Sequence, residues 1–256
     1  MNIEWEAGRY ASDFSFVPRY GESLMDLITA PAGSRVLDLG CGNGTLTQAL
    51  ADAGYEAWGM DASPQLISLA KSEHPQLRFV EGDAACFSLQ DKVDVVFSNA
   101  VFHWIDGERQ PDLVGCIAGA LVEGGELVCE FGGCGNNALI HHALREEFAR
   151  HGIAYEMPFY FPTVGEYARL LEDGGLQVRL ATLFDRLTML KGDDGLADWI
   201  RMFVKTPFAG MGQQLKDDIV RRAVERLAPQ LHRDGKWYAD YVRLRIRAVK
   251  RVGESM

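Results

Sequence analysis

The sequence has no long hydrophobic run. A membrane-spanning helix needs about 18 uninterrupted apolar residues, and no stretch of this chain approaches that length. The N-terminal residues 1–6, Met-Asn-Ile-Glu-Trp-Glu, carry two acids and lack the apolar centre of a signal peptide. We therefore expect a cytoplasmic protein with no membrane partner.

Cysteine is also scarce. The chain has five cysteines, an odd number, and no two of them are spaced C-x-x-C. This pattern excludes a disulfide framework and a zinc knuckle, so it predicts a reducing compartment and no metal site. The phosphate-binding pattern G-x-x-x-x-G-K-[ST] is absent as well, and we find neither an internal repeat nor a low-complexity linker.

What the chain does have is enough apolar material for a core. It contains 256 residues, of which 47% are hydrophobic and 24% charged, a composition that excludes general disorder. This length predicts a single domain over residues 1–256. The net charge of -10, from 26 basic and 36 acidic residues, describes an acidic body that would repel a nucleic-acid backbone.

One segment departs from this acidity. Residues 221–251 hold ten Arg and Lys against three acids, a local charge of +7. Such a segment can bind nucleic acid, or it can be a solvated helix face followed by a strand whose arginines share one side. The acidity of the rest favours the second interpretation, and we predict no nucleic-acid partner.

Short apolar runs alternate with segments of helical length. This alternation predicts a parallel sheet covered by helices on both faces, an α/β fold. The expected strands are 35–39, 55–60, 77–80, 93–98, 126–131, 176–184 and 237–248. The expected helices are 45–53, 64–73, 111–121, 137–150 and 164–172, with a mostly helical insertion over 193–232. In the last strand, Arg243, Arg245 and Arg247 alternate with apolar residues, so they should share one face.

A glycine-rich loop follows the first strand. It reads Asp38-Leu39-Gly40-Cys41-Gly42-Asn43-Gly44, and ligands of open parallel sheets bind beyond the carboxyl ends of strands. The dinucleotide fingerprint G-x-G-x-x-G would need glycine at Thr45, and an acid at Asp38 is badly placed beside a pyrophosphate. S-adenosylmethionine has no phosphate and carries an ammonium and a sulfonium group. The loop therefore favours S-adenosylmethionine over a dinucleotide.

Two further acids follow the next strands. Asp61 comes after the second strand, where its carboxylate can accept both ribose hydroxyls. Asp83 comes after the third strand, where it can accept from the adenine amino group. Either alone can equally be a helix cap or a solvated turn residue, but three acids at three successive strand ends indicate one ligand site.

These motifs, in this order, resemble those of class I S-adenosylmethionine-dependent methyltransferases. The resemblance covers about residues 30–132 and implies a Rossmann-like sheet of seven strands whose last strand is antiparallel. It implies that Asp38, Gly40, Gly42 and Gly44 contact the methionine end of the cofactor, Asp61 the ribose, and Asp83 with Ala84 the adenine. Further candidates for cofactor contact are Cys41, Ala62, Ser98 and Asn99; we do not read Cys41 as a nucleophile.

A narrower resemblance lies in the stretch Ser98-Asn99-Ala100-Val101-Phe102-His103-Trp104. It is similar to a stretch of the trans-aconitate methyltransferase-like proteins, with related versions in the enzyme that methylates malonyl-carrier protein. His103 is a candidate catalytic residue, as a general base or as a donor that orients a carboxylate, with a backbone-bonded supporting histidine as the alternative. Trp104, the second catalytic candidate, is read as a pocket wall whose indole N–H suits a carboxylate.

The aromatic N-terminal segment, residues 1–30, is expected to form a lid over the cofactor, since related methyltransferases use it so; core packing is the alternative. Tyr10 and Phe16 are its candidate cofactor contacts. Trp199, Met202, Phe203 and Phe208 of the insertion are expected to be core residues more than substrate contacts. Arg19, Arg243 and Arg245 are either anchors for an acidic substrate or surface charges.

These observations predict a small-molecule methyltransferase that uses S-adenosylmethionine and O-methylates a carboxylate. Transfer to N, C or a phenolic oxygen is the nearest alternative. A non-catalytic S-adenosylmethionine-binding protein, an RNA methyltransferase and a dinucleotide oxidoreductase are weaker alternatives. The acceptor is expected to be acidic, and the chain a monomer or homodimer.

Overall fold

The structure of the protein is a computed structural model, and the residues it describes are 23–252. Tyr10, Phe16 and Arg19 lie outside the described residues, as does most of the expected lid segment.

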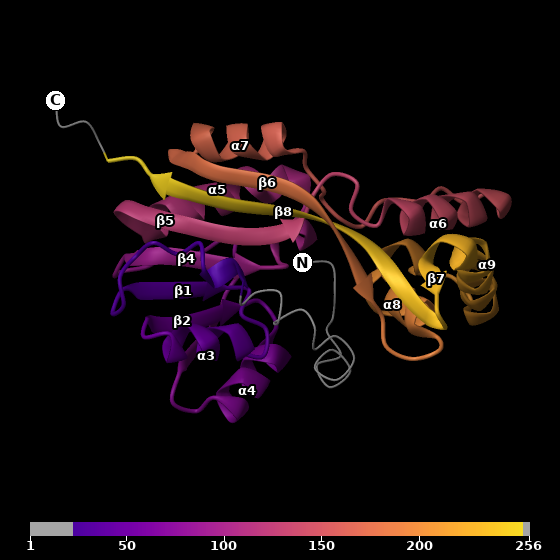
Figure 1. Ribbon diagram of the computed structural model, residues 1–256, viewed down its shortest axis with the longest axis horizontal. Coiled ribbons are helices and arrows are strands. Elements are labelled where there is room, and N and C mark those ends of the chain that lie inside the picture. The colour runs from indigo at the N-terminus through magenta and orange to yellow at the C-terminus, as the bar shows by residue number, and fades with distance from the viewer. Residues whose placement is uncertain (1–22, 253–256) are drawn as a thin grey trace.

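One mixed sheet forms the centre of the molecule (Figure 1). Its strand order is β3-β2-β1-β4-β5-β8-β6, and β7 pairs with β8 off this path. The strands β1 to β5 are parallel to one another, and β8 is antiparallel to both β5 and β6. The predicted Rossmann-like fold with an antiparallel last strand is confirmed. The strands are β1 (Arg35–Leu39), β2 (Glu56–Asp61), β3 (Arg78–Glu81), β4 (Val93–Asn99), β5 (Leu121–Gly132), β6 (Leu176–Met189), β7 (His232–Arg233) and β8 (Lys236–Lys250).

Helices cover both faces of the sheet (Figure 1). On one face lie α3 (Thr45–Asp52) and α4 (Pro64–Glu73), and on the other lie α5 (Gln110–Ala120) and α7 (Val164–Asp173). The helix α4 begins where sequence chemistry places it, because the Ser63 hydroxyl accepts from the N–H of Leu66 and Pro64 occupies the first helical position. On each face of the sheet, the helices and the strands bury an apolar cluster between them.

Two strands, β5 and β6, are much longer than predicted. β5 begins at Leu121 instead of Glu126, because a register shift in its pairing with β4 absorbs the Gly124-Gly125 turn into the strand. β6 continues past Phe184 to Met189 because it pairs with β8 along this whole length. Beyond Phe184 the apolar Leu187 and Met189 are exposed while the polar Thr188 is buried, so the usual pattern of a half-buried strand is reversed and did not mark this part of β6.

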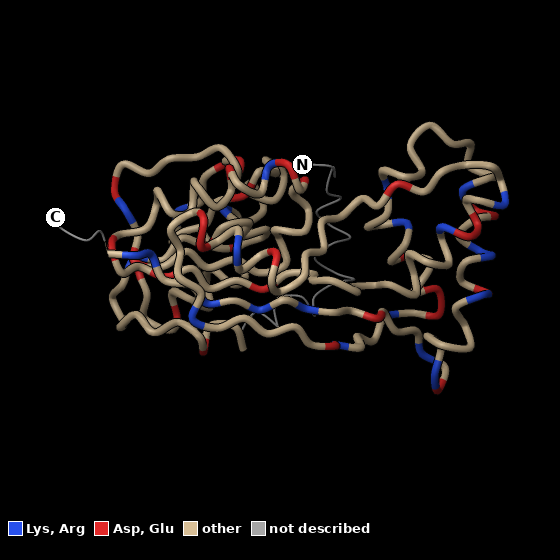
Figure 2. Tube along the Cα trace, turned by 90° about the horizontal axis from the view of Figure 1, so that it is seen from above, with Lys and Arg blue, Asp and Glu red and all other residues tan. Residues whose placement is uncertain are grey.

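The far ends of β6 and β8 leave the sheet as a two-stranded ribbon that carries a separate helical unit (Figures 1 and 2). This unit contains α6 (Ala138–Arg150), α8 (Gly195–Phe203) and α9 (Gln213–Leu231), with the short turn η3 (Thr206–Phe208). Trp199, Met202, Phe203 and Phe208 are buried in its own core, as expected. The unit also includes α6, which lies outside the predicted insertion 193–232.

The basic segment belongs to this unit and to β8. In α9, Arg221 and Arg222 both bond Asp218 at the surface, and basic and acidic positions alternate along the helix (Figure 2). The interpretation as a solvated helix face followed by a one-sided strand is confirmed.

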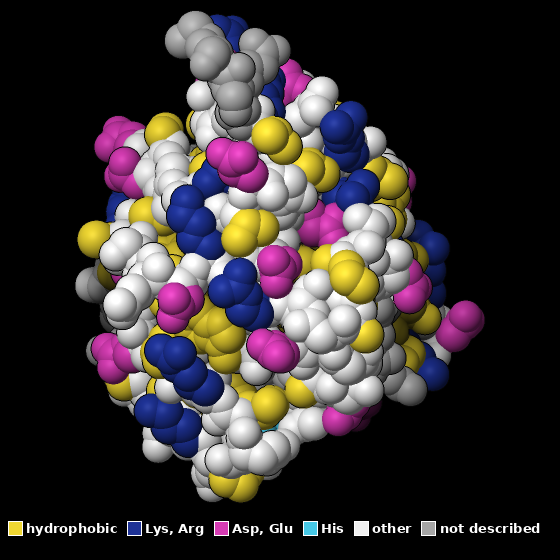
Figure 3. All heavy atoms as spheres, turned by 90° about the vertical axis from the view of Figure 1, so that its left-hand side faces the viewer, with side chains coloured by type: hydrophobic (Ala, Val, Ile, Leu, Met, Phe, Trp, Pro, Cys, Tyr) yellow, Lys and Arg dark blue, Asp and Glu magenta, His cyan; other side chains and the backbone are white. Residues whose placement is uncertain are grey.

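At the end of the sheet where the parallel strands begin, acidic and basic side chains are interspersed on the surface (Figure 3). Within residues 23–252, none of the helices combines the length and apolar character that crossing a bilayer demands.

Candidate functional site

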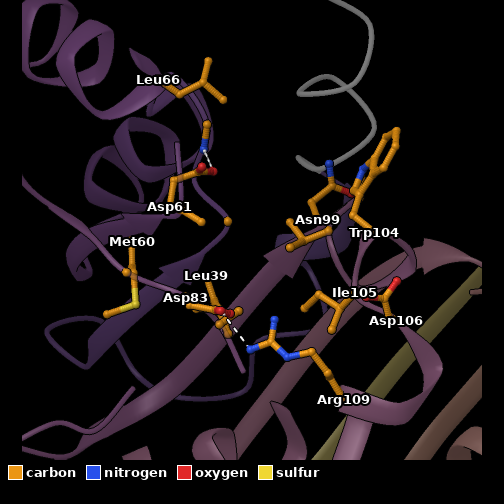
Figure 4. A pocket seen from close by; sticks show the side chains of 17 residues that line it. Leu39, Met60, Asp61, Leu66, Asp83, Asn99, Trp104, Ile105, Asp106 and Arg109 are labelled. Atoms are coloured by element: carbon orange, nitrogen blue, oxygen red, sulfur yellow. Dashed lines mark hydrogen bonds and ion pairs between the residues drawn. The ribbon is translucent and has the colours of Figure 1, made fainter. Parts of the chain in front are cut away.

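A pocket opens at the carboxyl ends of the parallel strands, where β1 and β4 lie side by side and the strand order reverses. Asp61 and Leu66 lie on one side of it and Asn99 and Trp104 on the other (Figure 4). Eight residues predicted from the sequence line it: Gly40, Gly42, Asp61, Ala62, Asp83, Ala84, Asn99 and Trp104. Leu39, Met60, Leu66, Gly82, Ala100, Val101, Ile105, Asp106 and Arg109 complete the lining.

Two glycines of the glycine-rich loop, Gly40 and Gly42, line this pocket. Gly40 has φ +81°, a left-handed conformation that favours glycine, and its N–H donates to the carbonyl of Met60 at 2.7 Å. A Cβ on Gly40 would overlap the side chain of Val101, whereas a Cβ on Gly42 would meet open space. Glycine at position 40 therefore lets the loop pass close to the chain that follows β4.

Asp61 is the most firmly held acid of the pocket. Its two carboxylate oxygens accept from the backbone N–H groups of Gly42, at 3.0 Å, and Ser63, at 2.8 Å. Burial raises the pKa of Asp61, and these backbone hydrogen bonds partly oppose the rise. The carboxylate is thus fixed at the pocket wall, with lone pairs left for hydroxyl donors.

Asp83 also lines the pocket, and it has a partner that the sequence did not indicate. One oxygen accepts from the N–H of Ala85 at 3.0 Å, and the other accepts from Arg109 at 2.8 Å (Figure 4). Burial tends to raise the pKa of Asp83, but the bonds from Ala85 and Arg109 outweigh it and lower the pKa. Arg109 lies 26 residues from Asp83 in the sequence, so only the folded chain reveals this pair.

Four predicted cofactor residues do not line this pocket. Asp38 is buried, accepts from the Thr47 hydroxyl at 2.7 Å, and has its pKa raised to about 7 by burial. Cys41 is buried in a cluster with Phe79, and burial raises its thiol pKa, which agrees with the view that it is not a nucleophile. Gly44 precedes α3 with φ +83°, and the Ser98 hydroxyl donates to the carbonyl of Leu39.

His103 is not among the residues that line the pocket; it lies in the short turn η1 (Phe102–Trp104) that follows β4. Its ring is buried, and its Nδ1 accepts from the backbone N–H of Gly132 at 3.2 Å. Burial, together with the positive charge of Arg243, lowers its pKa well below the usual value. His103 is therefore neutral at pH 7, and because Nδ1 is an acceptor, its proton is on Nε2.

Aromatic rings that the sequence did not indicate surround this histidine. Phe159 and Phe161 are stacked on each other, with ring centroids 5.3 Å apart. The ring centroids of Phe159 and Phe161 lie 6.1 and 6.0 Å from that of His103. Phe159 also contacts Trp104 edge-on, with ring centroids 4.8 Å apart. These two rings come from the irregular segment after α6, where no periodicity marks them.

Three arginines converge on one buried carboxylate, Glu130 of β5. Arg186 of β6 binds it through two hydrogen bonds, at 2.6 and 3.0 Å. Arg245 binds it at 2.7 Å, and Nε of Arg243 lies 3.4 Å from it. Their combined charge outweighs burial and lowers the pKa of Glu130. Arg243 and Arg245 are therefore not free surface charges, and Arg243 is itself buried.

Comparisons with known proteins agree with this geometry. A family model described as a methyltransferase domain matches residues 36–125. An uncharacterized methyltransferase of Schizosaccharomyces pombe is 30% identical over 258 residues, covering 96% of this chain and 98% of the relative. A trans-aconitate 2-methyltransferase of a Mycobacterium species is 35% identical, covering 64% of this chain and 67% of the relative.

The fold has solved counterparts. A TehB-like S-adenosylmethionine-dependent methyltransferase from Corynebacterium glutamicum superimposes with a TM-score of 0.56 at 20% identity, covering 96% of this chain and 98% of that one. The chain belongs to the class I S-adenosylmethionine-dependent methyltransferases, and S-adenosylmethionine is its cofactor.

Proposed function

We propose that this methyltransferase O-methylates a carboxylate of a small acidic molecule. The observation that carries the proposal is the hydrogen bond from the Gly132 N–H to Nδ1 of His103. A neutral histidine with its proton on Nε2 can donate a hydrogen bond but cannot take a proton at that nitrogen. A site arranged in this way suits an acceptor that needs no general base.

The pocket suits the cofactor that the family uses. Gly42 lines the pocket and leaves open space where a side chain would intrude, and the fixed carboxylate of Asp61 suits the ribose hydroxyls. Asp83, with Ala84, would receive the adenine amino group. When bound, S-adenosylmethionine supplies a methyl group on a sulfonium, and the neighbouring acids, Asp61 and Asp83, favour its positive charge.

A carboxylate is already ionised and nucleophilic at neutral pH, so its methylation requires no proton removal. Nε2–H of His103 and the indole of Trp104 would hold such an acceptor by hydrogen bonds, which fixes one carboxylate oxygen in line for displacement. The names of the relatives support this choice, because trans-aconitate 2-methyltransferases and a malonyl-carrier-protein O-methyltransferase are among them. Phenols and amines lose a proton on methylation, and His103 is poorly placed to accept it.

The test is the release of S-adenosylhomocysteine by purified protein over a panel of carboxylic acids, phenols and amines, each measured from pH 6 to pH 9. We expect turnover on carboxylates with a rate that is nearly independent of pH in this range. Turnover on phenols or amines alone, rising with pH, would overturn the proposal. Binding of S-adenosylhomocysteine with no turnover on any acceptor would favour a non-catalytic role.

A further inference from the structure

The arginines around Glu130 differ in how well their charges are compensated. Arg186 and Arg245 bind the carboxylate closely, at 2.6 to 3.0 Å, and Arg245 also bonds Ser23. Arg243 is different. Within residues 23–252 its hydrogen bond is the long contact from Nε to Glu130, at 3.4 Å, and its guanidinium otherwise lies over the ring of Tyr241.

Burial makes this difference matter. Arg243 is 7% exposed, and a buried guanidinium is costly unless anionic partners offset its desolvation. Burial lowers the pKa of Arg243 despite the opposing effect of Glu130, so one shared carboxylate does not fully compensate it. A buried arginine with terminal nitrogens left for bonding is suited to bind an anionic group in a bidentate manner.

Arg243 is also next to the proposed acceptor site. It is the register partner of Gly132 across the β5–β8 pairing, and Gly132 is the residue whose N–H bonds His103. Its charge contributes to the low pKa of His103. Gly132 therefore connects Arg243, its partner on the neighbouring strand, to the ring that we propose to orient the reacting carboxylate.

A guanidinium is a poor partner for the reacting group itself. A bidentate ion pair would occupy both oxygens of a carboxylate and weaken its nucleophilicity, whereas neutral donors such as Nε2–H leave a lone pair available. Binding a non-reacting part of the substrate carries no such penalty and positions the reacting part. The two donor types near Gly132 thus suit two different anionic groups.

We propose that Arg243 is a specificity-determining residue that binds a second, non-reacting anionic group of the acceptor. This inference rests on the proposed carboxylate methylation and adds that the acceptor carries two anionic groups. The second group is a carboxylate or a phosphate, since both accept bidentate hydrogen bonds from arginine.

The experiment compares acceptors that differ in one charge. Glutarate, pentanoate and 4-phosphonobutanoate share a similar length and carry two carboxylates, one carboxylate, and a carboxylate with a phosphonate. We expect the wild-type protein to prefer one of the dianions over pentanoate by about 10- to 100-fold in kcat/KM, the value of one charge-assisted hydrogen bond. Which dianion is preferred distinguishes a carboxylate from a phosphate as the second group.

Variants then assign the preference to Arg243. Arg243→Met should raise KM for the preferred dianion by about 10- to 100-fold and leave pentanoate within about two-fold, while Arg243→Lys should recover part of the loss. Arg247→Met is the matched control, because Arg247 shares the face of β8 but binds Glu126 instead of Glu130. It should leave the dianion preference unchanged.

The outcomes separate this inference from the proposed function. Equal turnover of pentanoate and both dianions, or an equal loss on all three in Arg243→Met, would overturn the inference and leave carboxylate methylation standing. Turnover of phenols with none of the three acids would overturn the function first. If no acceptor turns over, calorimetric titration of glutarate and pentanoate into protein saturated with S-adenosylhomocysteine decides: equal affinities, or an Arg243→Met variant that binds glutarate as the wild type does, would overturn the role of Arg243.

Discussion

The backbone N–H of Gly132 donates to Nδ1 of His103 at 3.2 Å, from the last residue of β5 to the turn that follows β4. These two strands are neighbours in the sheet, so their pairing fixes the position of the donor. The bond determines which nitrogen of the ring carries the proton. It also makes the protonation of His103 depend on the sheet itself and not on a mobile side chain.

Replacing His103 should affect turnover more than cofactor binding. His103→Ala removes the proposed Nε2–H donor, so we expect kcat/KM on a carboxylate acceptor to fall by about 10- to 100-fold. The dissociation constant of S-adenosylhomocysteine, measured by calorimetry, should change by less than about three-fold, since His103 does not line the cofactor pocket. A wild-type rate would reduce His103 to a supporting residue. An inflection near pH 6.5 in the wild-type rate would contradict its low pKa.

Asp61→Asn should weaken cofactor binding. The amide keeps one acceptor oxygen, so one of the two backbone donors, Gly42 or Ser63, loses its partner and the ribose loses a charged acceptor. We expect the dissociation constant of S-adenosylhomocysteine to rise by about 10- to 100-fold. Glu56→Gln is the control, because Glu56 is exposed at the opposite end of the same strand. Unchanged affinity in Asp61→Asn would remove the ribose assignment.

The pair of Arg109 and Asp83 should contribute little and depend on salt. Both side chains are more than a third exposed, and ion pairs of this kind contribute at most about 1 kcal/mol. Arg109→Gln should therefore weaken cofactor binding by no more than about five-fold at low ionic strength. The difference from wild type should shrink at 0.5 M salt. A larger effect that persists in high salt would mean that Arg109 contacts the cofactor directly.

Two glycines of the loop should tolerate alanine differently. Both have positive φ, so each alanine costs about 1–2 kcal/mol of backbone strain. Gly40→Ala also forces a Cβ against Val101, while Gly42→Ala enters open space. We expect Gly40→Ala to lower the free energy of unfolding by about 1–3 kcal/mol more than Gly42→Ala. Val101→Ala combined with Gly40→Ala should recover most of that difference, and equal losses in the two single variants would show that the loop adjusts.

His141 should make the fold sensitive to acid. The ring is 1% exposed, and burial, assisted by the charge of Arg145, lowers its pKa to about 3. The unfolded chain binds a proton below about pH 6.5 and the folded chain does not. Stability that is present above pH 6.5 is therefore lost as the pH falls toward 3, by at most about 1.4 kcal/mol per pH unit.

Urea unfolding at several pH values between 4 and 7 measures this slope. His141→Gln should flatten it relative to the wild type. Tyr155→Phe is the control, because it removes the hydroxyl that His141 bonds at 2.7 Å but keeps the titrating ring. Parallel pH profiles in wild type and His141→Gln would show that other groups produce the acid sensitivity.

The sequence predicts the sheet well and the site only in part. Asp61, Asp83 and the glycines could be placed because each lies at or just after the end of a strand, and parallel strands bring their carboxyl ends to one edge. The extension of β6 to Met189 was not visible, because in the ribbon the apolar Leu187 and Met189 are exposed while the polar Thr188 is buried, the reverse of the usual strand pattern.

The residues missed at the site depend on contacts between distant segments. Arg109 meets Asp83, and Arg186 meets Glu130 across 56 residues of sequence. No spacing in the sequence predicts which charged residues meet at such separations, since their contact follows from how the chain folds. The sequence did place Arg243 and Arg245 on one face of the last strand. It could not show that a buried carboxylate on the next strand lies beneath them.

The helical excursion begins and ends at adjacent points of one ribbon, since Met189 and Tyr238 are register partners. Topologically, α8 and α9 are therefore the loop of a β-hairpin. A hairpin loop can be lengthened, shortened or exchanged without shifting the register of the strands that carry it. The helices α8 and α9 can thus change in length or packing while Glu130, Gly132 and Arg243 keep their positions, so the architecture separates a part that is free to vary from the part that we propose binds the acceptor.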